Sequence, residues 1–271
     1  MALPPPAPDR TCVVTGASSG IGADIARELA GRGLGLTLVA RREDRLRALA
    51  GELATRHHIG VEVIAADLTD DGSRQALAGE IAGRGLTVDV LVNNAGFSTW
   101  GPVHGSDRSR EVALVRTDVE AVVDLCSTFL PAMVDRGRGA VLNVASTAAF
   151  QPVPGQAAYG AAKAFVLSYT QAVRAELRGT GVTATALCPG PVRTEFAETA
   201  GVADEEASAA LPRIMWVSSE AVAKAAVDGL DHDRAVVIPG AVNRFAAIGA
   251  QHVPRRLLLP LLARQHPSLR P

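Results

Sequence analysis

The chain has 271 residues, 48% of them hydrophobic and 4% aromatic, and a formal net charge of −1. A chain of this length can bury one large core, and no long polar linker divides it, so we expect a single domain. The near-neutral charge and the lack of a basic stripe interleaved with aromatic residues argue against nucleic acid as a partner.

Neither the N-terminus nor the cysteines predict an exported protein. The first residues, MALPPPAPDR, lack the basic and apolar regions of a signal peptide, so we predict a flexible tail over residues 1–10 and a cytoplasmic protein. The cysteines Cys12, Cys126 and Cys188 lie in apolar segments without a CxxC or Cys/His cluster. We therefore expect reduced cysteines in the core and no metal site.

Apolar runs alternate with helical patterns along most of the chain. Strands are predicted, in chain order, at Thr11–Gly16, Gly35–Arg41, Val61–Leu68, Val88–Gly96, Gly139–Ser146 and Val182–Gly190, with a last strand at AVVIPG. Helices are expected between them, the longest over roughly Asp107–Asp135. Such alternation is typical of a parallel sheet covered on both faces. The predicted fold class is α/β, a doubly wound parallel sheet of about seven strands.

Two segments depart from this alternation. An acidic, alanine-rich stretch at about 195–216 follows a late strand, and because ligands bind at that edge of such sheets we predict a substrate lid there. Residues 11–240 would form the catalytic domain and residues 241–271 a C-terminal extension. The extension contains RRLLLPLLAR and is too interrupted by proline and arginine to span a bilayer. Three roles are open for this extension: it packs on the core, it forms a subunit interface, or it rests on a membrane. Of these, packing on the core is favoured and membrane contact is the least expected.

A tyrosine and a lysine stand four residues apart in QAAYGAAKAFVLSY, a predicted helix. Helical spacing places Tyr159 and Lys163 on one face. The pairing is informative because the chain has two tyrosines and, with 25 of its 27 basic residues arginine, two lysines. An ammonium beside a phenol lowers the phenol pKa from about 10, which suits proton transfer at a carbonyl oxygen. The alternative is an amphipathic helix in which Tyr159 packs in the core and Lys163 reaches solvent.

Glycines separate the first predicted strand from its helix, in TGASSGIG. Gly16, Gly20 and Gly22 would let the backbone turn tightly and approach a pyrophosphate, which the free N–H groups and dipole of the helix end attract. The position of this turn after a buried strand predicts a dinucleotide site.

The end of the second predicted strand indicates which nicotinamide cofactor binds. It carries Arg41 and Arg42 and no carboxylate before Glu43, whereas NAD would require an acidic partner for its 2'-hydroxyl. Arginine can pair with a 2'-phosphate through two hydrogen bonds. We predict NADP (NADPH), with Arg41 as the first contact and Arg42 as the second. The alternative is that both arginines are solvated charges at a helix start.

Together these features resemble the short-chain dehydrogenase/reductase family in its compact single-domain form, over about Thr11–Pro239. The resemblance rests on the ordered motifs TGASSGIG, Asp67 after the third strand, NNAG at Asn93–Gly96, Ser146, YGAAK at Tyr159–Lys163 and PGPVRT at Pro189–Thr194. It implies a Rossmann-type sheet of seven strands in a homodimer or homotetramer. It also implies cofactor contacts from Gly16, Ser18, Ser19, Gly20, Ile21, Gly22, Asp67, Leu68, Asn94, Ala95, Gly96, Tyr159, Lys163, Pro189, Gly190, Val192 and Thr194.

The resemblance also implies the roles at the reacting centre. Ser146 would orient a carbonyl group and Tyr159 would protonate its oxygen, while Lys163 lowers the Tyr159 pKa and binds the nicotinamide ribose. Many family members carry an asparagine in the helix after NNAG, and the aligned residue here is Asp118. A carboxylate there could pair with Lys163 and reduce its help to Tyr159, so we predict turnover with an altered pH profile. The alternative for Asp118 is a helix-surface aspartate.

These residues predict an NADP-dependent oxidoreductase, a carbonyl reductase, that transfers a hydride between nicotinamide and a ketone or secondary alcohol. One alternative is a non-catalytic NADP-binding sensor or regulator, for which only Asp118 argues; another is epimerisation or dehydration through a transient ketone. The substrate pocket is expected from Phe97–Trp100, Ala148–Val153 and the lid. Their mostly apolar or small side chains favour a hydrophobic small molecule over a sugar or a carboxylate.

Overall fold

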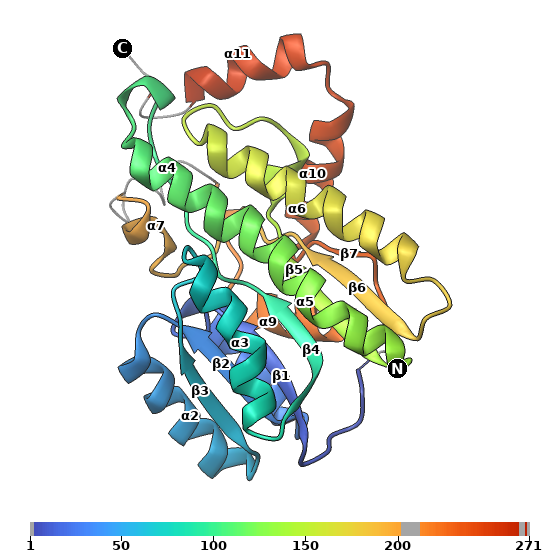
Figure 1. Cartoon of the computed structure of the whole chain (residues 1–271). Coiled ribbons are helices and arrows are strands. Elements are labelled where there is room, and N and C mark those ends of the chain that lie inside the picture. Colours follow the sequence, from blue (N-terminus) through green and yellow to red (C-terminus); the bar gives the residue numbers. More distant parts are fainter. Residues whose placement is uncertain (1–2, 202–211, 266–268, 270–271) are drawn as a thin grey trace.

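Seven parallel strands form one sheet in the computed structural model, which describes residues 3–201, 212–265 and 269 (Figure 1). The strands are β1 (Arg10–Thr15), β2 (Leu36–Ala40), β3 (Val61–Ala65), β4 (Thr87–Asn93), β5 (Gly139–Val144), β6 (Val182–Leu187) and β7 (Val236–Val237). Their order is β3-β2-β1-β4-β5-β6-β7, and each neighbouring pair is parallel. The predicted fold class is confirmed. Successive strands are added on one side of β1 up to β3 and on its other side from β4, so a ligand crevice is expected beyond the carboxyl ends of β1 and β4.

Helices cover both faces of the sheet (Figure 1). They are α1 (Gly20–Gly31), α2 (Glu43–His57), α3 (Asp71–Gly83), α4 (Arg108–Val115), α5 (Ala121–Asp135), α6 (Ala157–Glu176), α7 (Phe196–Thr199), α9 (Ser219–Asp231), α10 (Ala241–His252) and α11 (Arg255–Gln265). Apolar side chains of α3, α5 and α6 pack on one face, and those of α1, α2 and α9 on the other. The predicted core cysteines are buried and free.

A π-helical turn interrupts the helix predicted over Asp107–Asp135. It spans Arg116–Glu120 and joins α4 to α5. The extra residue in a π turn rotates the following side chains relative to a regular α-helix, and such turns are frequent at functional sites. Here the turn contains Asp118, which is buried.

Several strands end earlier than the apolar pattern predicts. β3 ends at Ala65, β4 at Asn93 and β6 at Leu187, and the residues that follow form loops at the carboxyl edge of the sheet. The strand predicted at AVVIPG pairs over two residues only. An apolar run does not distinguish a buried strand from a buried loop, and the loop residues are the ones placed to meet a ligand.

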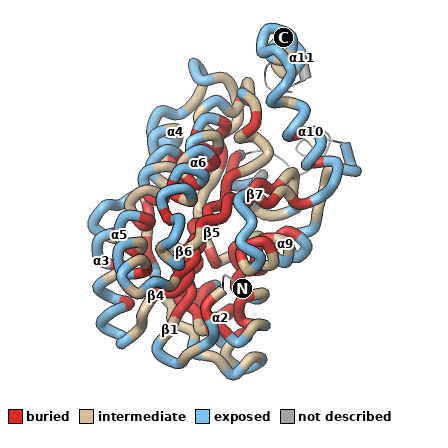
Figure 2. Tube along the Cα trace, turned by 90° about the vertical axis from the view of Figure 1, so that its right-hand side faces the viewer, coloured by how far each residue is buried: buried red, intermediate tan, exposed pale blue. Residues whose placement is uncertain are grey.

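The segments outside the sheet take several forms. Leu3 packs against the core and Pro4 is buried. Of the predicted lid, α7 and a 3-10 turn at Arg213–Met215 are described, whereas residues 202–211 lie outside the described residues. The C-terminal extension forms α10 and α11, which lie at the margin of the molecule and are largely exposed (Figure 2). Among the described residues, no helix is long and apolar enough to cross a membrane.

Candidate active site

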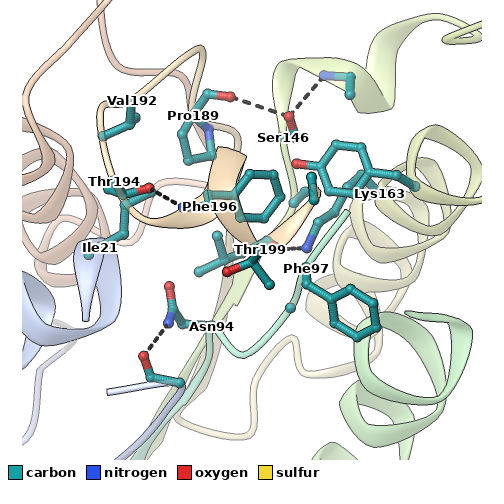
Figure 3. Close-up of a pocket in the computed structure, with 18 of the residues that line it drawn as sticks. Ile21, Asn94, Phe97, Ser146, Lys163, Pro189, Val192, Thr194, Phe196 and Thr199 are labelled. Carbon is teal, nitrogen blue, oxygen red and sulfur yellow. Dashed lines mark hydrogen bonds between the residues drawn. The ribbon is translucent and has the colours of Figure 1, made fainter. Parts of the chain in front are cut away.

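One cavity of about 650 Å³ gathers the predicted site residues at the carboxyl edge of the sheet (Figure 3). The predicted residues that line it are Gly16, Ser18, Ser19, Gly20, Ile21, Gly22, Arg41, Arg42, Asp67, Leu68, Asn94, Ala95, Gly96, Ser146, Tyr159, Lys163, Pro189, Gly190, Val192 and Thr194. They come from seven separate segments of the chain. Asp118 does not line the cavity but lies behind its wall.

The glycine turn after β1 has no room for larger side chains. A Cβ on Gly22 would lie 2.3 Å from Asn94 Nδ2, and one on Gly16 would lie 2.8 Å from Ala95 Cα. Gly16 also has a φ of 65°, a conformation that favours glycine. Asn94 Nδ2 donates to Thr15 O at 2.9 Å, so Asn94 holds the turn against β4. The backbone is thereby fixed close to the cavity.

The N-terminal end of α1 is suited to a phosphate group. Gly20 and Ile21 of its first turn line the cavity, and Ser19, the residue before the helix, makes no side-chain cap to the free N–H groups. Uncapped N–H groups and the helix dipole attract an anion. The glycine turn and this helix end together fit the pyrophosphate of a dinucleotide.

Arg42 is bound to the glycine turn and to the segment after β6. Its guanidinium donates to Ser18 Oγ at 2.9 Å, to Ser19 Oγ at 2.7 Å and to Glu195 at 2.7 Å. Arg45 donates to the other oxygen of Glu195 at 2.6 Å. These donors, Arg42 first, hold the pKa of Glu195 down to about 2. Glu195 lies within the predicted lid, and nothing in the sequence indicates its pairing with Arg42 and Arg45.

Arg41 differs from its neighbour. Its side chain is exposed, lines the cavity and has no ion pair or hydrogen bond with the described residues. A 2'-phosphate could therefore bind Arg41 without breaking an existing contact, whereas Arg42 would have to share its donors with Glu195. The order of the two arginines as contacts of a 2'-phosphate stays a prediction.

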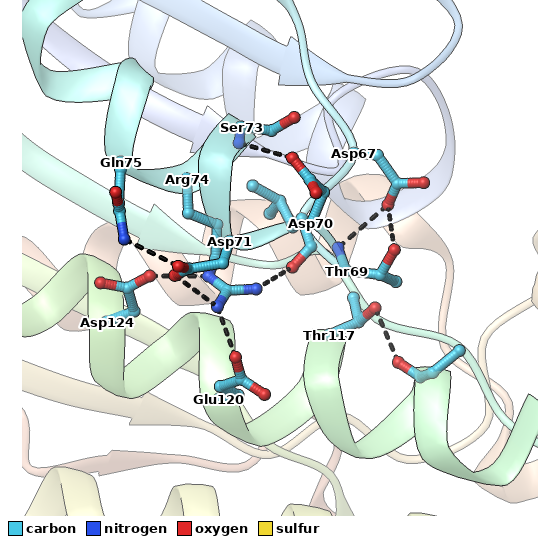
Figure 4. Close-up of polar contacts among 12 residues, drawn as sticks. Asp67, Thr69, Asp70, Asp71, Ser73, Arg74, Gln75, Thr117, Glu120 and Asp124 are labelled. Carbon is cyan, nitrogen blue, oxygen red and sulfur yellow. Dashed lines mark hydrogen bonds and ion pairs between the residues drawn. The ribbon is translucent and has the colours of Figure 1, made fainter. Parts of the chain in front are cut away.

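Arg74 organises the loop after β3, whose residues Asp67 and Leu68 line the cavity (Figure 4). It is 2% exposed, donates to Leu68 O at 2.9 Å and to Asp124 at 2.6 Å, and pairs with Glu120. Asp67 Oδ1 accepts from the backbone N–H and the hydroxyl of Thr69. Arg74 thus ties the Asp67–Leu68 loop to the helix that carries Asp118, a role that the sequence did not reveal.

Ser146 and Lys163 approach the cavity from neighbouring elements (Figure 3). Ser146 follows β5 and its Oγ accepts from Ala148 N–H at 3.1 Å, which fixes the hydroxyl at the start of a 3-10 turn. Lys163 lies on α6, is 4% exposed and donates to Val144 O at 3.0 Å. The alternative in which the Lys163 side chain reaches solvent is therefore wrong. Its Nζ lies 5.7 Å from the ring centre of Tyr159.

Asp118 pairs with Lys163 in the interior. The carboxylate is fully buried, its Oδ2 lies 2.8 Å from Lys163 Nζ, and its Oδ1 accepts from Phe97 N–H at 3.1 Å. A Cβ on Gly96 would lie 2.8 Å from Asp118 Oδ2, so the NNAG loop packs directly on the carboxylate. The helix-surface alternative for Asp118 is wrong.

Burial and charge act in opposite directions on this group of side chains. Burial raises the pKa of Tyr159, and the Asp118 charge raises it further. The Lys163 ammonium and the Ser146 hydroxyl lower it, but the net direction is upward. Burial alone would lower the pKa of Lys163, but the Asp118 carboxylate and Tyr159 raise it. The net direction of the Lys163 pKa is upward, which favours its charged form. The predicted lowering of the Tyr159 pKa is therefore wrong, because the sequence does not reveal how strongly burial raises this pKa.

Two further residues of the cavity wall were missed. Asn243 of α10 is 1% exposed and donates to Met215 O at 2.9 Å, and a Cβ on Gly190 would lie 2.4 Å from its side chain. Phe196 of α7 contacts Tyr159, with ring centres 5.6 Å apart. Asn243 lies outside every motif of the sequence, and nothing in the sequence distinguishes Phe196 from the rest of the lid.

The comparison with known proteins identifies the family. Residues 10–205 match the family model described as short chain dehydrogenase. The chain belongs to the short-chain dehydrogenase/reductase family. As a member of it, the protein is an oxidoreductase that uses a nicotinamide cofactor and a small-molecule substrate.

Relatives within the family differ in what they act on. The chain is 37% identical over 203 residues to sulfoacetaldehyde reductase 2 of Chromohalobacter salexigens, covering 74% of this chain and 80% of that protein. Its structure is similar to that of a short-chain dehydrogenase from Sphingobium yanoikuyae in complex with NADPH, with a TM-score of 0.79, 34% identity and coverage of 93% and 95%. It is also similar to the bulky-bulky ketone specific alcohol dehydrogenase from Comamonas testosteroni, with a TM-score of 0.74, 29% identity and coverage of 94% and 92%.

Proposed function

We propose that this short-chain dehydrogenase/reductase is an NADP-dependent carbonyl reductase that interconverts a hydrophobic ketone and its secondary alcohol. The observation that carries the proposal is the convergence of Ser146, Tyr159 and Lys163 on the same cavity as the glycine turn. A hydroxyl, a phenol and a charged ammonium beside a dinucleotide site are the groups that carbonyl reduction requires.

Three side chains would take part in the proton transfer to the substrate oxygen. The bound cofactor supplies the hydride. Ser146 would donate a hydrogen bond to the substrate oxygen and orient it, and Tyr159 would give its phenolic proton to that oxygen as negative charge develops there. Lys163, held by Val144 O and Asp118, favours the phenolate that remains. In the oxidative direction Tyr159 takes up the proton.

The basic end of the cavity supports NADP over NAD. Arg41 and Arg42 line it, and both lie where the second strand of the sheet meets α2. Arg41 has unoccupied donors for a 2'-phosphate, and the Sphingobium yanoikuyae protein of similar structure is described with NADPH.

The rest of the wall supports a hydrophobic substrate. Phe97, Trp100, Val153, Phe196 and Trp216 line the cavity. Apolar and aromatic surfaces bind apolar ligands by removing their surface from water. The similar protein from Comamonas testosteroni is described as specific for bulky-bulky ketones, which agrees with this class. The homodimer or homotetramer, the cytoplasmic location and the domain limits at residues 10 and 240 stay predictions.

The test is the oxidation of NADPH by the purified protein with a panel of aliphatic, aromatic and cyclic ketones. NADPH should be oxidised in the presence of hydrophobic ketones, and faster than NADH is. The activity should disappear in Tyr159→Phe, which keeps the aromatic ring but removes the phenolic proton. Tyr169→Phe is the matched control, because Tyr169 lies on the same helix but does not line the cavity.

Three results would contradict the proposal in different parts. NADPH binding without turnover on the whole panel would favour the non-catalytic sensor. A preference for NADH would overturn the roles of Arg41 and Arg42. Substrate conversion without net consumption of the cofactor would indicate epimerisation or dehydration.

A further inference from the structure

Helices α10 and α11 and the residues between them expose large apolar side chains, and we call this exposed surface the outer face. They are Val242, Phe245, Ile248, Val253, Leu257, Leu259 and Leu261. Phe245 is 77% exposed, Leu257 63% and Leu261 53%. In α11, Leu257 and Leu261 are four residues apart and thus share one side of the helix. Exposed apolar residues that gather in this way mark a surface for a partner, whereas scattered single ones do not.

The same two helices carry positive charge without compensation. Residues 241–264 contain Arg244, Arg255, Arg256 and Arg264 and no aspartate or glutamate. All four arginines are exposed, and none forms an ion pair with the described residues. Elsewhere in the protein many arginines are paired, as Arg27 is with Glu52 and Arg84 with Glu62. The basic charge on this face is therefore available to an anionic partner.

The inner side of these helices is already used. Ala246 and Ala250 of α10 and Leu262 of α11 line the cavity. Leu258, one turn before Leu262, is half-buried. The inner and outer sides of α11 are thus distinct, and the outer side of both helices lies at one end of the molecule (Figure 2).

We propose that the outer face of α10 and α11 docks on the surface of an anionic lipid bilayer. Exposed leucine and phenylalanine would enter the boundary between headgroups and acyl chains while the arginines bind anionic headgroups. The helices would lie along the surface, since no helix among the described residues is long and apolar enough to span a bilayer. A second copy of the chain fits less well, because residues 241–264 offer no carboxylate that could pair with the arginines of the copy in a two-fold contact through this face.

Vesicle sedimentation with the full-length protein tests the proposal without any need for a substrate. Vesicles of phosphatidylcholine alone are compared with vesicles that also contain phosphatidylglycerol. We expect binding to the anionic vesicles that weakens as salt is added, and much weaker binding to the neutral ones.

Two exposed double variants separate the apolar and charged contributions. Leu257→Gln/Leu261→Gln should lower the vesicle partition coefficient at least about tenfold. Arg255→Gln/Arg256→Gln should weaken binding to anionic vesicles by about fivefold per arginine. Arg56→Gln/Arg234→Gln, which removes two exposed arginines from other parts of the surface, should leave binding unchanged. Melting temperatures confirm that each variant is folded.

The outcomes decide between the candidate partners. Absence of binding to anionic vesicles, or binding that both α11 variants retain, overturns the proposal. So does an oligomer in solution that Leu257→Gln/Leu261→Gln dissociates, because the face would then belong to a second copy. Because each result is a binding or mass measurement, failure here leaves the proposed reductase activity untouched.

Discussion

Replacing Asp118 by asparagine is the perturbation whose effect on the active site is most clearly defined by the structure. The Asp118 carboxylate lies 2.8 Å from Lys163 Nζ, which lies 5.7 Å from the Tyr159 ring centre. The carboxylate is therefore within about 8.5 Å of the ring. At an effective dielectric constant of about 20, a charge at that distance contributes about 2 kcal/mol to ionisation of the phenol.

The sign follows from the charges. The Asp118 carboxylate raises the pKa of Tyr159, so its removal lowers that pKa and favours the phenolate. In the reductive direction Tyr159 must carry a proton, and the alkaline limb of the rate profile should move to lower pH. Since about 1.4 kcal/mol corresponds to one pH unit, about 2 kcal/mol corresponds to an expected displacement of about 1.4 units. In the oxidative direction Tyr159 must be deprotonated, so the acidic limb of that rate profile should also move to lower pH.

The assay is the pH dependence of kcat/KM for NADPH oxidation by the protein and by Asp118→Asn. Asparagine keeps the acceptor for Phe97 N–H but leaves the buried Lys163 charge unpaired, so stability should also fall, by up to about 3 kcal/mol. Asp89→Asn is the matched control, because Asp89 is equally buried and ion-paired, with Arg138, but does not line the cavity. It should lower stability without moving the pH profile.

Two results would refute this reasoning. An unchanged rate and pH profile would mean that Asp118 has no influence on Tyr159. A displacement to higher pH would mean that Lys163 loses its proton once its partner is gone, so that the phenol is deprived of the ammonium beside it.

Three other substitutions follow from the same cavity. Glu195→Gln should free donors of Arg42 for the cofactor phosphate and raise the preference for NADPH over NADH, measured as a ratio of KM values, by up to about fivefold. Gly22→Ala should lower the free energy of unfolding by about 1–3 kcal/mol in a denaturant titration, whereas Gly51→Ala, where a Cβ meets nothing within 4 Å, should not destabilise. Phe196→Ala should raise the KM for hydrophobic ketones about fivefold and leave the pH profile in place.

The fold could be predicted from the sequence because each level of pattern agrees with the others. Val13 and Leu91, within apolar runs, are buried in the sheet, and the glycines at positions 16 and 22 are required by contacts below 3 Å. The strands end earlier than predicted, since loop residues such as Ala66 and Leu68 are apolar and buried like those of the strand that precedes them. The local sequence pattern determines which segments form helices or strands, whereas the pairing of backbone groups with the neighbouring strand determines the residue at which a strand ends.

Long-range pairs could not be predicted. Arg42 and Glu195 are 153 residues apart, and Arg74 meets Asp124 across 50 residues. Each of these side chains is an ordinary surface charge in its own segment, and only the folded chain brings them together. Asp118 was identified through the family pattern, yet its full burial depends on the π turn, which has no signature in the local sequence.

The ion pairs of Glu195 and of Asp118 should respond differently to a change of pH. Glu195 is half-exposed and its arginine partners hold its pKa at about 2, below the usual value of 4.5. Its contribution to stability is therefore complete above about pH 4.5 and is lost only as the pH falls toward 2. The Glu195 contacts are thus constant across the range in which the enzyme is assayed. Of these two groups, only the buried one can therefore change the rate near neutrality and above, because the Asp118 charge raises the pKa of Tyr159.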